Sequence, residues 1–344
     1  VGAVGALSGG GVVFARSREQ ARVQQLQDLT QTPLPPLATS NIPVAAITDF
    51  HPTDPYITPN DNFYRIDTAL SFPRVDRAKW KLRIHGLVER EKLFSLDDLQ
   101  ALPQVERIIT LCCVSNEVGG PYIGNAVWRG VLLKDVLESC GINKDAEQVF
   151  TTSLDGWTSG FPVSAALDGR DALIAIGMNG QSLPLMHGYP ARLVVPGLYG
   201  YVSATKWLSE INITTWSAEQ GYWIPRGWSR DAPIKTQSRI DVPRQGESIA
   251  AGKFRLAGVA WAQHTGVEKV ELRIDRGAWQ TCDLGVDLTD DAWRQWIFDW
   301  DATAGEHTIQ VRSTDKSGYT QTEEVRRVDP DGATGWHTRT VTVK

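Results

Sequence analysis

The last third of the chain alternates apolar and polar side chains, as in the segments KVELRIDRGAWQTC, WRQWIFDWD and HTIQVRSTD. Successive side chains of a β-strand point to opposite faces of the sheet, so this period of two predicts strands with one buried face. Turn residues at Asp275 to Gly277 and at Gly305 predict hairpins between these strands. Because several short strands at this spacing are typical of a β-sandwich, we expect an all-β, immunoglobulin-like domain over residues 231–344.

The aromatic residues of this region support a sandwich core. Trp296, Phe298 and Trp300 are spaced by two, so they share one face of their strand and are expected to be buried. Cys282 is the only cysteine of the region, which excludes a disulfide within it. Hydrophobic packing must therefore hold the predicted domain together.

Residues 46–230 mix predicted strands with predicted helices. WKLRIHGLV at 80–88 has the composition of a strand, and ARLVVPG at 191–197 that of a buried strand. Helices are predicted at SLDDLQAL, where Ser95 can cap the N-terminus, and at VLLKDVLESCG, where Gly141 can end the helix. Since no regular strand–helix–strand repeat links these elements, the pattern indicates an α+β domain rather than a doubly wound parallel sheet.

The first 15 residues, VGAVGALSGGGVVFA, are apolar and small. They are fewer than the roughly 20 residues that a bilayer span needs. We interpret them as the end of a membrane helix, with Gly5 and Gly9 at a spacing that lets such helices pack closely. A signal-peptide segment or a glycine-rich leader is the alternative. Residues 16–45 are polar and then proline-rich, which predicts an extended stalk.

The overall charge argues against nucleic-acid binding. The formal net charge is -5 with a pI near 5.7, and no cluster of Lys and Arg is present that could displace counterions from a phosphate backbone. A hydrophobic content of 42% with 22% charged residues is typical of a globular protein. Small-molecule chemistry is therefore the favoured class of function.

Two of the four cysteines, Cys112 and Cys113, stand side by side where a β-branched run gives way to the loop VSNEVGG. Adjacent cysteines rarely form a disulfide, and only one of two successive strand residues can face the loop, so we expect one in the core and one exposed. A thiolate here could bind a transition metal, but no CxxC, HExxH or second Cys/His cluster supplies further protein ligands, so the metal would have to bring its own. Cys–His nucleophilic catalysis, with His187 or His51 as the base, is the competing interpretation.

TLCCVSN is one of several motifs, in the same order, by which the chain resembles the sulfite oxidase family of molybdopterin enzymes. The others are IGNAVWRGVLLKDVL, LDGWTSGFPV and MNGQSLPLMHGYPARLVVPGLYGYVSATKW. The resemblance runs from about Asn62 to the C-terminus, and the last segment is similar to the family's molybdenum-cofactor dimerisation domain. It implies a sulfite-oxidase-like molybdopterin domain at 46–230, followed by a sandwich domain at 231–344 that forms a homodimer.

The resemblance also implies which residues bind the cofactor, a molybdopterin with a single pterin and a terminal phosphate. The family's cysteine is followed three residues later by Asn, which picks out Cys113 with Asn116 and makes Cys113 the sole protein ligand of molybdenum. Arg65 is expected near the metal as a second catalytic residue, and the guanidinium of Arg192 suits a phosphate. The implied cofactor-binding residues are Tyr64, Arg65, Asp155, His187, Arg192, Ser203, Ala204, Thr205 and Lys206.

Two positions depart from the sulfite-binding pattern of the family. Val118 stands where a second substrate-binding arginine is expected, and Ile176 where we place the active-site tyrosine. A less cationic site is a poor receptor for a doubly charged oxyanion. We therefore expect two-electron oxygen-atom transfer to or from a small S- or N-containing substrate other than sulfite. The alternatives are a true sulfite oxidase, a membrane-tethered immunoglobulin-like binding protein, and a cofactor-carrying domain without turnover.

The electrons of such a reaction need a second protein. The sequence has no C-x-x-C-H haem motif, so we expect no haem and a separate cytochrome or a quinone-linked partner. We expect the protein at the cell membrane with its soluble part outside the cytoplasm, which implies export of the folded domain because the cofactor is inserted in the cytoplasm. Arg16, Arg18 and Arg22 favour the opposite side, since basic residues beside a span tend to stay in the cytoplasm.

Overall fold

A computed structural model of the chain describes residues 32–38, 40, 42, 50, 52–69 and 71–344. The predicted membrane segment at 1–15 and most of the predicted stalk at 16–45 lie outside these residues. Within the described ranges, every helix is too short or too polar to cross a bilayer.

The part of the chain before about residue 230 is built on two sheets. The first joins, in this order, β2 (Lys92–Phe94), β1 (Leu82–Gly86), β10 (Leu208–Thr214), β5 (Gln148–Ser153) and β6 (Thr158–Pro162). The second joins β3 (Val105–Cys112), β4 (Ile123–Leu132), β7 (Leu173–Met178) and β8 (Gln181–Ser182), and β9 (Arg192–Val194) also pairs with β7.

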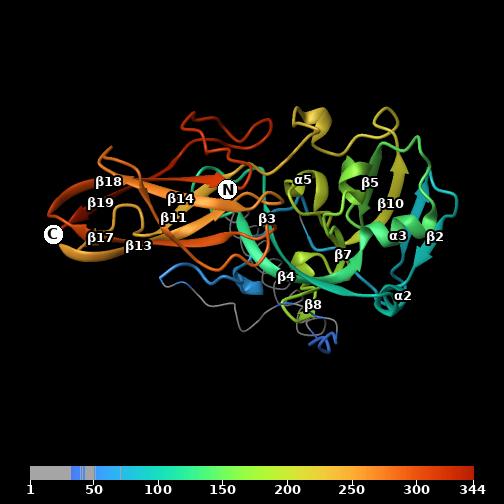
Figure 1. Cartoon of the computed structure of the whole chain (residues 1–344). Coiled ribbons are helices and arrows are strands. Elements are labelled where there is room, and N and C mark those ends of the chain that lie inside the picture. Colours follow the sequence, from blue (N-terminus) through green and yellow to red (C-terminus); the bar gives the residue numbers. More distant parts are fainter. Residues whose placement is uncertain (1–31, 39, 41, 43–49, 51, 70) are drawn as a thin grey trace, which may run out of the picture.

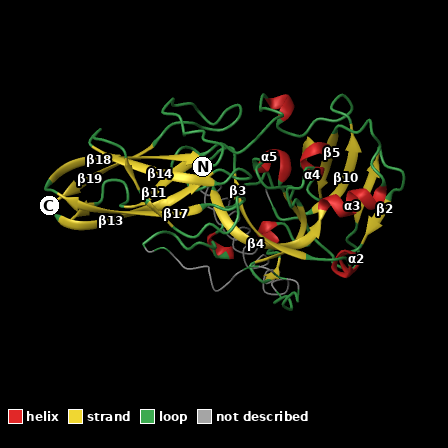
Figure 2. Cartoon of the chain, viewed as in Figure 1, coloured by secondary structure: helices red, strands yellow, loops and turns green. Residues whose placement is uncertain are grey.

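The helices of this part are short (Figure 2). They are α2 (Leu96–Ala101), α3 (Leu133–Cys140), α4 (Val163–Leu167) and α5 (Gly200–Ser203), with the 3-10 turns η2 (Asn60–Asn62), η3 (Leu185–His187) and η4 (Ile224–Arg226). Two sheets with a few short helices confirm the predicted α+β class, although strands predominate.

Both predicted helix ends are present. The hydroxyl oxygen of Ser95 accepts a hydrogen bond from the Asp98 N–H at 3.1 Å, and the Asp98 carboxylate accepts one from the Ser95 N–H at 2.7 Å, which together form a capping box at the start of α2. Gly141 follows α3 with a φ of 73°, in the left-handed region that glycine adopts without strain.

The C-terminal part is the predicted sandwich. One sheet joins β11 (Gln237–Val242), β13 (Gly252–Trp261), β17 (Arg294–Ala302) and β16 (Asp283–Leu284). The other joins β12 (Ser248–Ile249), β19 (His337–Val343), β18 (Gly305–Asp315), β14 (Val267–Ile274) and β15 (Gln280–Thr281). The aromatic stripe of β17 packs on the core between them, with Trp296 fully buried.

One of the two predicted hairpins is wrong. The turn after Ile274 does connect β14 to its antiparallel partner β15. At Gly305, however, β17 and β18 do not pair, because β17 belongs with β13 and β16 while β18 lies between β14 and β19. Alternation shows that each strand has a buried face. It does not show whether two successive strands pair within one sheet or lie in the two opposite sheets of a sandwich.

The two parts share a continuous interior. Figure 1 shows the sandwich at one end of the molecule, β2 and β10 at the other, and β3 between them. Thr110 of β3 is fully buried there: its N–H donates to Asp291, its hydroxyl oxygen accepts from the Trp293 N–H, and its carbonyl accepts from Gln263. The strand that leads to the paired cysteines is therefore held by the C-terminal domain.

Candidate active site

A cavity of the described structure collects side chains that are far apart in the sequence. Its walls come from the residues after η2, the residues after β3, the turn between β5 and β6, helix α5 and the segment leading to the sandwich. It holds about 940 Å³ free of protein atoms, including open solvent at its mouth. Six of the ten expected site residues line it: Tyr64, Cys113, Asp155, Arg192, Ala204 and Lys206.

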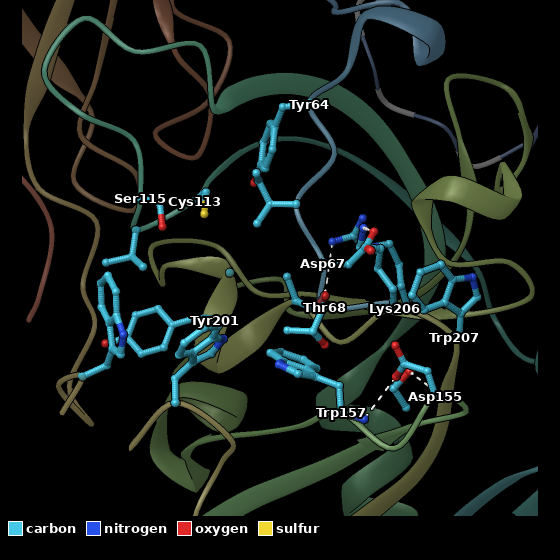
Figure 3. A pocket seen from close by; sticks show the side chains of 18 of the residues that line it. Tyr64, Asp67, Thr68, Cys113, Ser115, Asp155, Trp157, Tyr201, Lys206 and Trp207 are labelled. Atoms are coloured by element: carbon cyan, nitrogen blue, oxygen red, sulfur yellow. Dashed lines mark hydrogen bonds and ion pairs between the residues drawn. The ribbon is translucent and has the colours of Figure 1, made fainter. Parts of the chain in front are cut away.

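The cavity has two chemically different ends. Figure 3 shows Cys113, Ser115 and Tyr201 on one side, which we call the thiol end. It shows Asp67, Asp155 and Lys206 on the opposite side, which we call the charged end. Ionic and sulfur chemistry are thus separated along one cavity.

At the thiol end, both cysteines are buried, so the expectation that one of them is exposed is wrong. Cys112 is the last residue of β3 and belongs to the core, and its thiol contacts the carbonyl of Cys113 at 3.5 Å. Only Cys113 lines the cavity. Its backbone is held by Tyr122, whose carbonyl accepts from the Cys113 N–H at 3.0 Å. Burial raises the pKa of both thiols, so neither is poised as a free thiolate.

Arg192 is a buried cation without an anionic partner among the described residues. Its guanidinium donates only to backbone carbonyls, those of Leu193 at 3.3 Å, His187 at 3.1 Å and Ala204 at 3.4 Å. Burial lowers its pKa to about 10, which is unusual for an arginine. A buried charge of this kind is costly unless a ligand supplies the missing negative charge.

Lys206 and Arg65 share a single carboxylate at the charged end. Asp67 accepts from the Lys206 ammonium at 2.8 Å and from Arg65 Nε at 2.8 Å. Burial lowers the pKa of Lys206 to about 8, although Asp67 acts in the opposite direction. Arg65 itself does not line the cavity, since its guanidinium lies over the Phe72 ring, 4.1 Å from the centroid.

Three further expected residues also lie behind the cavity wall. His187 is buried, with Nε2 2.8 Å from the Asn60 carbonyl, and burial lowers its pKa to about 3, so the ring is neutral at pH 7. The Ser203 hydroxyl donates to the carbonyls of Leu198 and Tyr199. The Thr205 hydroxyl contacts those of Thr151 and Ser159 at 2.7 and 2.8 Å. These side chains shape the wall, and their polar atoms are already bonded within the protein.

The same geometry bears on the Cys–His interpretation. His187 is engaged with Asn60 and does not line the cavity with Cys113. A general base must reach the proton that it removes, so this arrangement does not support His187 in that role. His51 lies outside the described residues.

Sequence reasoning missed several lining residues, among them Asp67, Ser115, Trp157, Tyr201, Trp223 and Trp228. Some stand close to expected residues, as Asp67 does two residues after Arg65, and Trp157 lies in the quoted motif LDGWTSGFPV, two residues after Asp155. Trp223 and Trp228 stand in GYWIPRGW, whose density of aromatic residues just before the sandwich was the available signal.

The two departures used to infer the substrate do not lie at the cavity. Ile176 is buried in the core of β7, and Val118 is half-buried in the loop before β4, and neither is a lining residue. Ile176 therefore contributes no side chain to the lining, and its correspondence to an active-site tyrosine stays a prediction. Arginines of the segment before the sandwich do not replace the charge: Arg226 lies over the Tyr222 ring and Arg230 over the Trp216 ring.

The loop after Cys113 rests on the C-terminal domain. Gly119 lies directly against the buried imidazole of His337, where a methyl group would collide with the ring. The carbonyl of Gly120 accepts from Arg239 of β11 at 3.2 Å, and Arg239 also pairs with Asp54 and Asp241. The sandwich therefore helps to set the position of the cysteine loop.

Comparison with known proteins assigns the chain to a family. The model of the oxidoreductase molybdopterin-binding domain matches residues 69–223. The uncharacterized oxidoreductase YuiH of Bacillus subtilis is 35% identical over 153 residues, 44% of this chain and 74% of that protein. The mitochondrial sulfite oxidase of Homo sapiens is 30% identical over 308 residues, 75% of this chain and 56% of that protein. The chain belongs to the sulfite oxidase family of molybdopterin-dependent oxidoreductases.

The fold agrees with this family. The sulfane dehydrogenase SoxCD from Paracoccus pantotrophus superposes with a TM-score of 0.71 at 22% identity, covering 91% of this chain and 90% of that one. The chain spans only 50% to 56% of the length of the mammalian sulfite oxidases that it matches.

The residues present fit a molybdopterin. Arg65 and Lys206 share the single carboxylate of Asp67, and Arg192 donates only to backbone carbonyls, which leaves an excess of positive charge that suits a phosphate. No group of three or more His, Cys, Asp or Glu side chains in the described ranges could hold a metal alone. A metal bonded to Cys113 would then depend on ligands from the cofactor, as a dithiolene provides.

Proposed function

We propose that the protein catalyses two-electron oxygen-atom transfer to or from a small S- or N-containing substrate at a molybdenum bound to Cys113. The observation that carries this proposal is the presence, in one cavity, of the Cys113 thiol and of two cations, Arg192 and Lys206, of which only Lys206 has a carboxylate partner among the described residues. A cofactor with a metal at one end and a phosphate at the other matches this separation of chemistry.

Each residue then has a role that its contacts permit. Cys113 is the protein ligand of the metal, and Arg192 and Lys206 bind the terminal phosphate. Lys206 then either keeps its ion pair with Asp67 while it contacts the phosphate, or Asp67 moves away. Tyr64 and Asp155 face the pterin from the cavity wall. Arg65, expected beside the metal as a catalytic residue, pairs with Asp67 of the charged end and takes a supporting role in this proposal. His187, Ser203 and Thr205 also support the wall from behind, and the backbone of Ala204 completes the phosphate end. When bound, the molybdenum supplies the oxygen-atom transfer, and the protein supplies position and charge.

The substrate that we propose is uncharged rather than sulfite. The lining residues that we place at the thiol end include Cys113, Val114, Ser115 and Tyr201, none of which carries a charge at neutral pH. A dianion brought to this end would lose its hydration without gaining a counter-charge. True sulfite oxidation is the second candidate, and the similarity to proteins named sulfite oxidase favours it.

The remaining parts of the proposal rest on the sequence. A separate cytochrome or a quinone-linked protein exchanges electrons with the metal, a membrane segment at 1–15 tethers the domain outside the cytoplasm, and the sandwich forms a homodimer.

Molybdenum analysis with a matched pair of cysteine variants tests the function. Protein from cells that make the cofactor should contain about one molybdenum and one pterin per chain. Cys113→Ala should lose turnover by at least about 100-fold, since a metal ligand is removed, whereas Cys112→Ala, which removes a core thiol only, should retain most of it. A metal-free protein from such cells would contradict the proposal and would favour a binding protein. Equal loss in both variants would show that Cys113 is not the ligand.

A further inference from the structure

We infer that Tyr201, Trp223 and Trp228, which we call the aromatic wall, form a subsite that binds a flat apolar group of the substrate. The substrate class that fits is an uncharged sulfoxide with an aryl group on sulfur. This inference deepens the proposed function and rests on it for the chemistry, but the wall can also be tested by binding alone.

The three rings are packed together at the thiol end. The Tyr201 and Trp228 ring centroids are 5.7 Å apart, and those of Trp228 and Trp223 are 6.1 Å apart. All three line the cavity that Cys113 lines, and Figure 3 shows Tyr201 on the same side as Cys113. The Tyr201 hydroxyl donates to the Ser229 carbonyl, which ties α5 to the segment that carries both tryptophans.

The wall is not merely part of the hydrophobic core. Trp207, Trp261 and Trp296 are almost fully buried, at 1%, 0% and 0% exposure. Trp223 and Trp228 are only half-buried, although they pack on the same core cluster as Trp261. Apolar surface left open at the mouth of a cavity, beside a few polar groups, is typical of a ligand subsite.

The electrostatics of the wall select against anions. The face of an aromatic ring carries a negative quadrupole, so it repels an oxyanion and tolerates an apolar or positively polarised group. The guanidinium of the nearby Arg226 lies over the Tyr222 ring, 3.6 Å from its centroid, and donates to the Tyr222 carbonyl. Arg230 lines a different cavity. In an aryl sulfoxide, the sulfur is polarised positively and the aryl group can pack on the wall.

The reaction on this substrate balances with an external electron donor. The S–O bond breaks, sulfur keeps an electron pair as the sulfoxide becomes a thioether, and oxygen leaves as water after taking two protons from solvent. The two electrons come from a one-electron donor protein, for which reduced methyl viologen substitutes in an assay.

The experiment compares methyl phenyl sulfoxide with dimethyl sulfoxide in the molybdenum-loaded full chain. We expect kcat/KM for the aryl substrate to exceed that for the dimethyl one by at least about 10-fold, and Trp228→Ala to remove most of this preference while changing dimethyl sulfoxide turnover less than about 3-fold. Trp216→Ala, on the same segment but away from the cavity, is the control and should change neither. Equal loss of both substrates in Trp228→Ala, or sulfite oxidation that exceeds both reductions, would overturn the inference.

A binding measurement separates failure of the wall from failure of the proposed function. Methyl phenyl sulfone, which serves as an uncharged aryl probe, should bind the full chain about 10-fold more weakly after Trp228→Ala, by isothermal titration. If the protein lacks molybdenum, the proposed function fails, but this comparison still decides the wall. An unchanged Kd in Trp228→Ala would refute the aromatic subsite whatever the metal content.

Discussion

Replacing Arg192 by methionine should weaken cofactor binding far more than it weakens the fold. Arg192 is buried with backbone carbonyls as its hydrogen-bond acceptors, and burial lowers its pKa from 12.5 to about 10. A change of this size corresponds to roughly 3 kcal/mol by which the buried charge destabilises the cofactor-free protein at neutral pH. The charge is therefore a cost to folding that only an anionic ligand offsets.

Arg192→Met removes the cost of the buried charge, but it also removes hydrogen bonds whose total contribution to stability is of similar size. Its three backbone hydrogen bonds, at 3.1 to 3.4 Å, contribute about 0.5 to 1.5 kcal/mol each at most. We therefore expect the free energy of unfolding of the cofactor-free variant to stay within about 2 kcal/mol of wild type. Loss of a charge-assisted phosphate contact costs about 1.5 to 3 kcal/mol, so cofactor affinity should fall about 10- to 150-fold.

Two measurements on the same variant test this reasoning. Denaturant unfolding of protein from cells that cannot make the cofactor gives the free energy of unfolding, and molybdenum and pterin analysis of protein from competent cells gives occupancy. Arg129→Met is the control, because Arg129 is a buried arginine paired with Glu106 at 2.6 Å, away from the cavity. It should lose about 3 to 5 kcal/mol by leaving Glu106 unpaired, with normal occupancy in the folded fraction. If Arg192→Met instead lost that much stability and kept full occupancy, Arg192 would be a structural residue.

Three further predictions concern the surroundings of the site. The pKa of His187 in the folded protein is about 3, so between pH 6.5 and 3 only the unfolded state binds a proton at this ring. The free energy of unfolding should therefore fall with decreasing pH by about 1.4 kcal/mol per pH unit because of this group, and His187→Gln should reduce the measured slope by that amount. Since burial brings the pKa of Lys206 to about 8, the affinity of cofactor-free protein for inorganic phosphate should fall as pH rises through about 8, and calorimetry on Lys206→Arg should show no such fall. Arg239→Met should cost about 3 to 5 kcal/mol in denaturant unfolding by leaving the buried Asp241 unpaired, and should lower molybdenum content because the loop at Gly120 loses its support; normal content would show that the sandwich does not position that loop.

Local features were predictable because their causes are local. The Ser95 cap needs only a hydroxyl three residues before an acceptor side chain, and Gly141 needs only a glycine after a helix. The strands of the sandwich follow from alternation, and the motif by which the chain resembles the family picked out Cys113, the cysteine that lines the cavity, over Cys112. Each of these depends on residues within one turn, one strand or one motif.

The placement of the candidate site depended on contacts that no local pattern contains. Asp67 and Lys206 are 139 residues apart, and nothing in either segment indicates that they form an ion pair. Ser203 and Thr205 stand in a motif that suggested phosphate contacts, yet their hydroxyls have partners inside the protein.

The amino-acid sequence by itself determined the α+β and sandwich domains, the paired-cysteine loop and the family, because hydrophobic period, turn residues and ordered motifs are properties of neighbouring residues. Only the tertiary structure decided that β17 and β18 lie in opposite sheets, that Ile176 is core, and that Trp228 lines the cavity. The physical reason is that the hydrophobic period of a segment shows which of its side chains face the interior. Which side chains they contact there depends on packing among distant strands, and many strand pairings satisfy the same period.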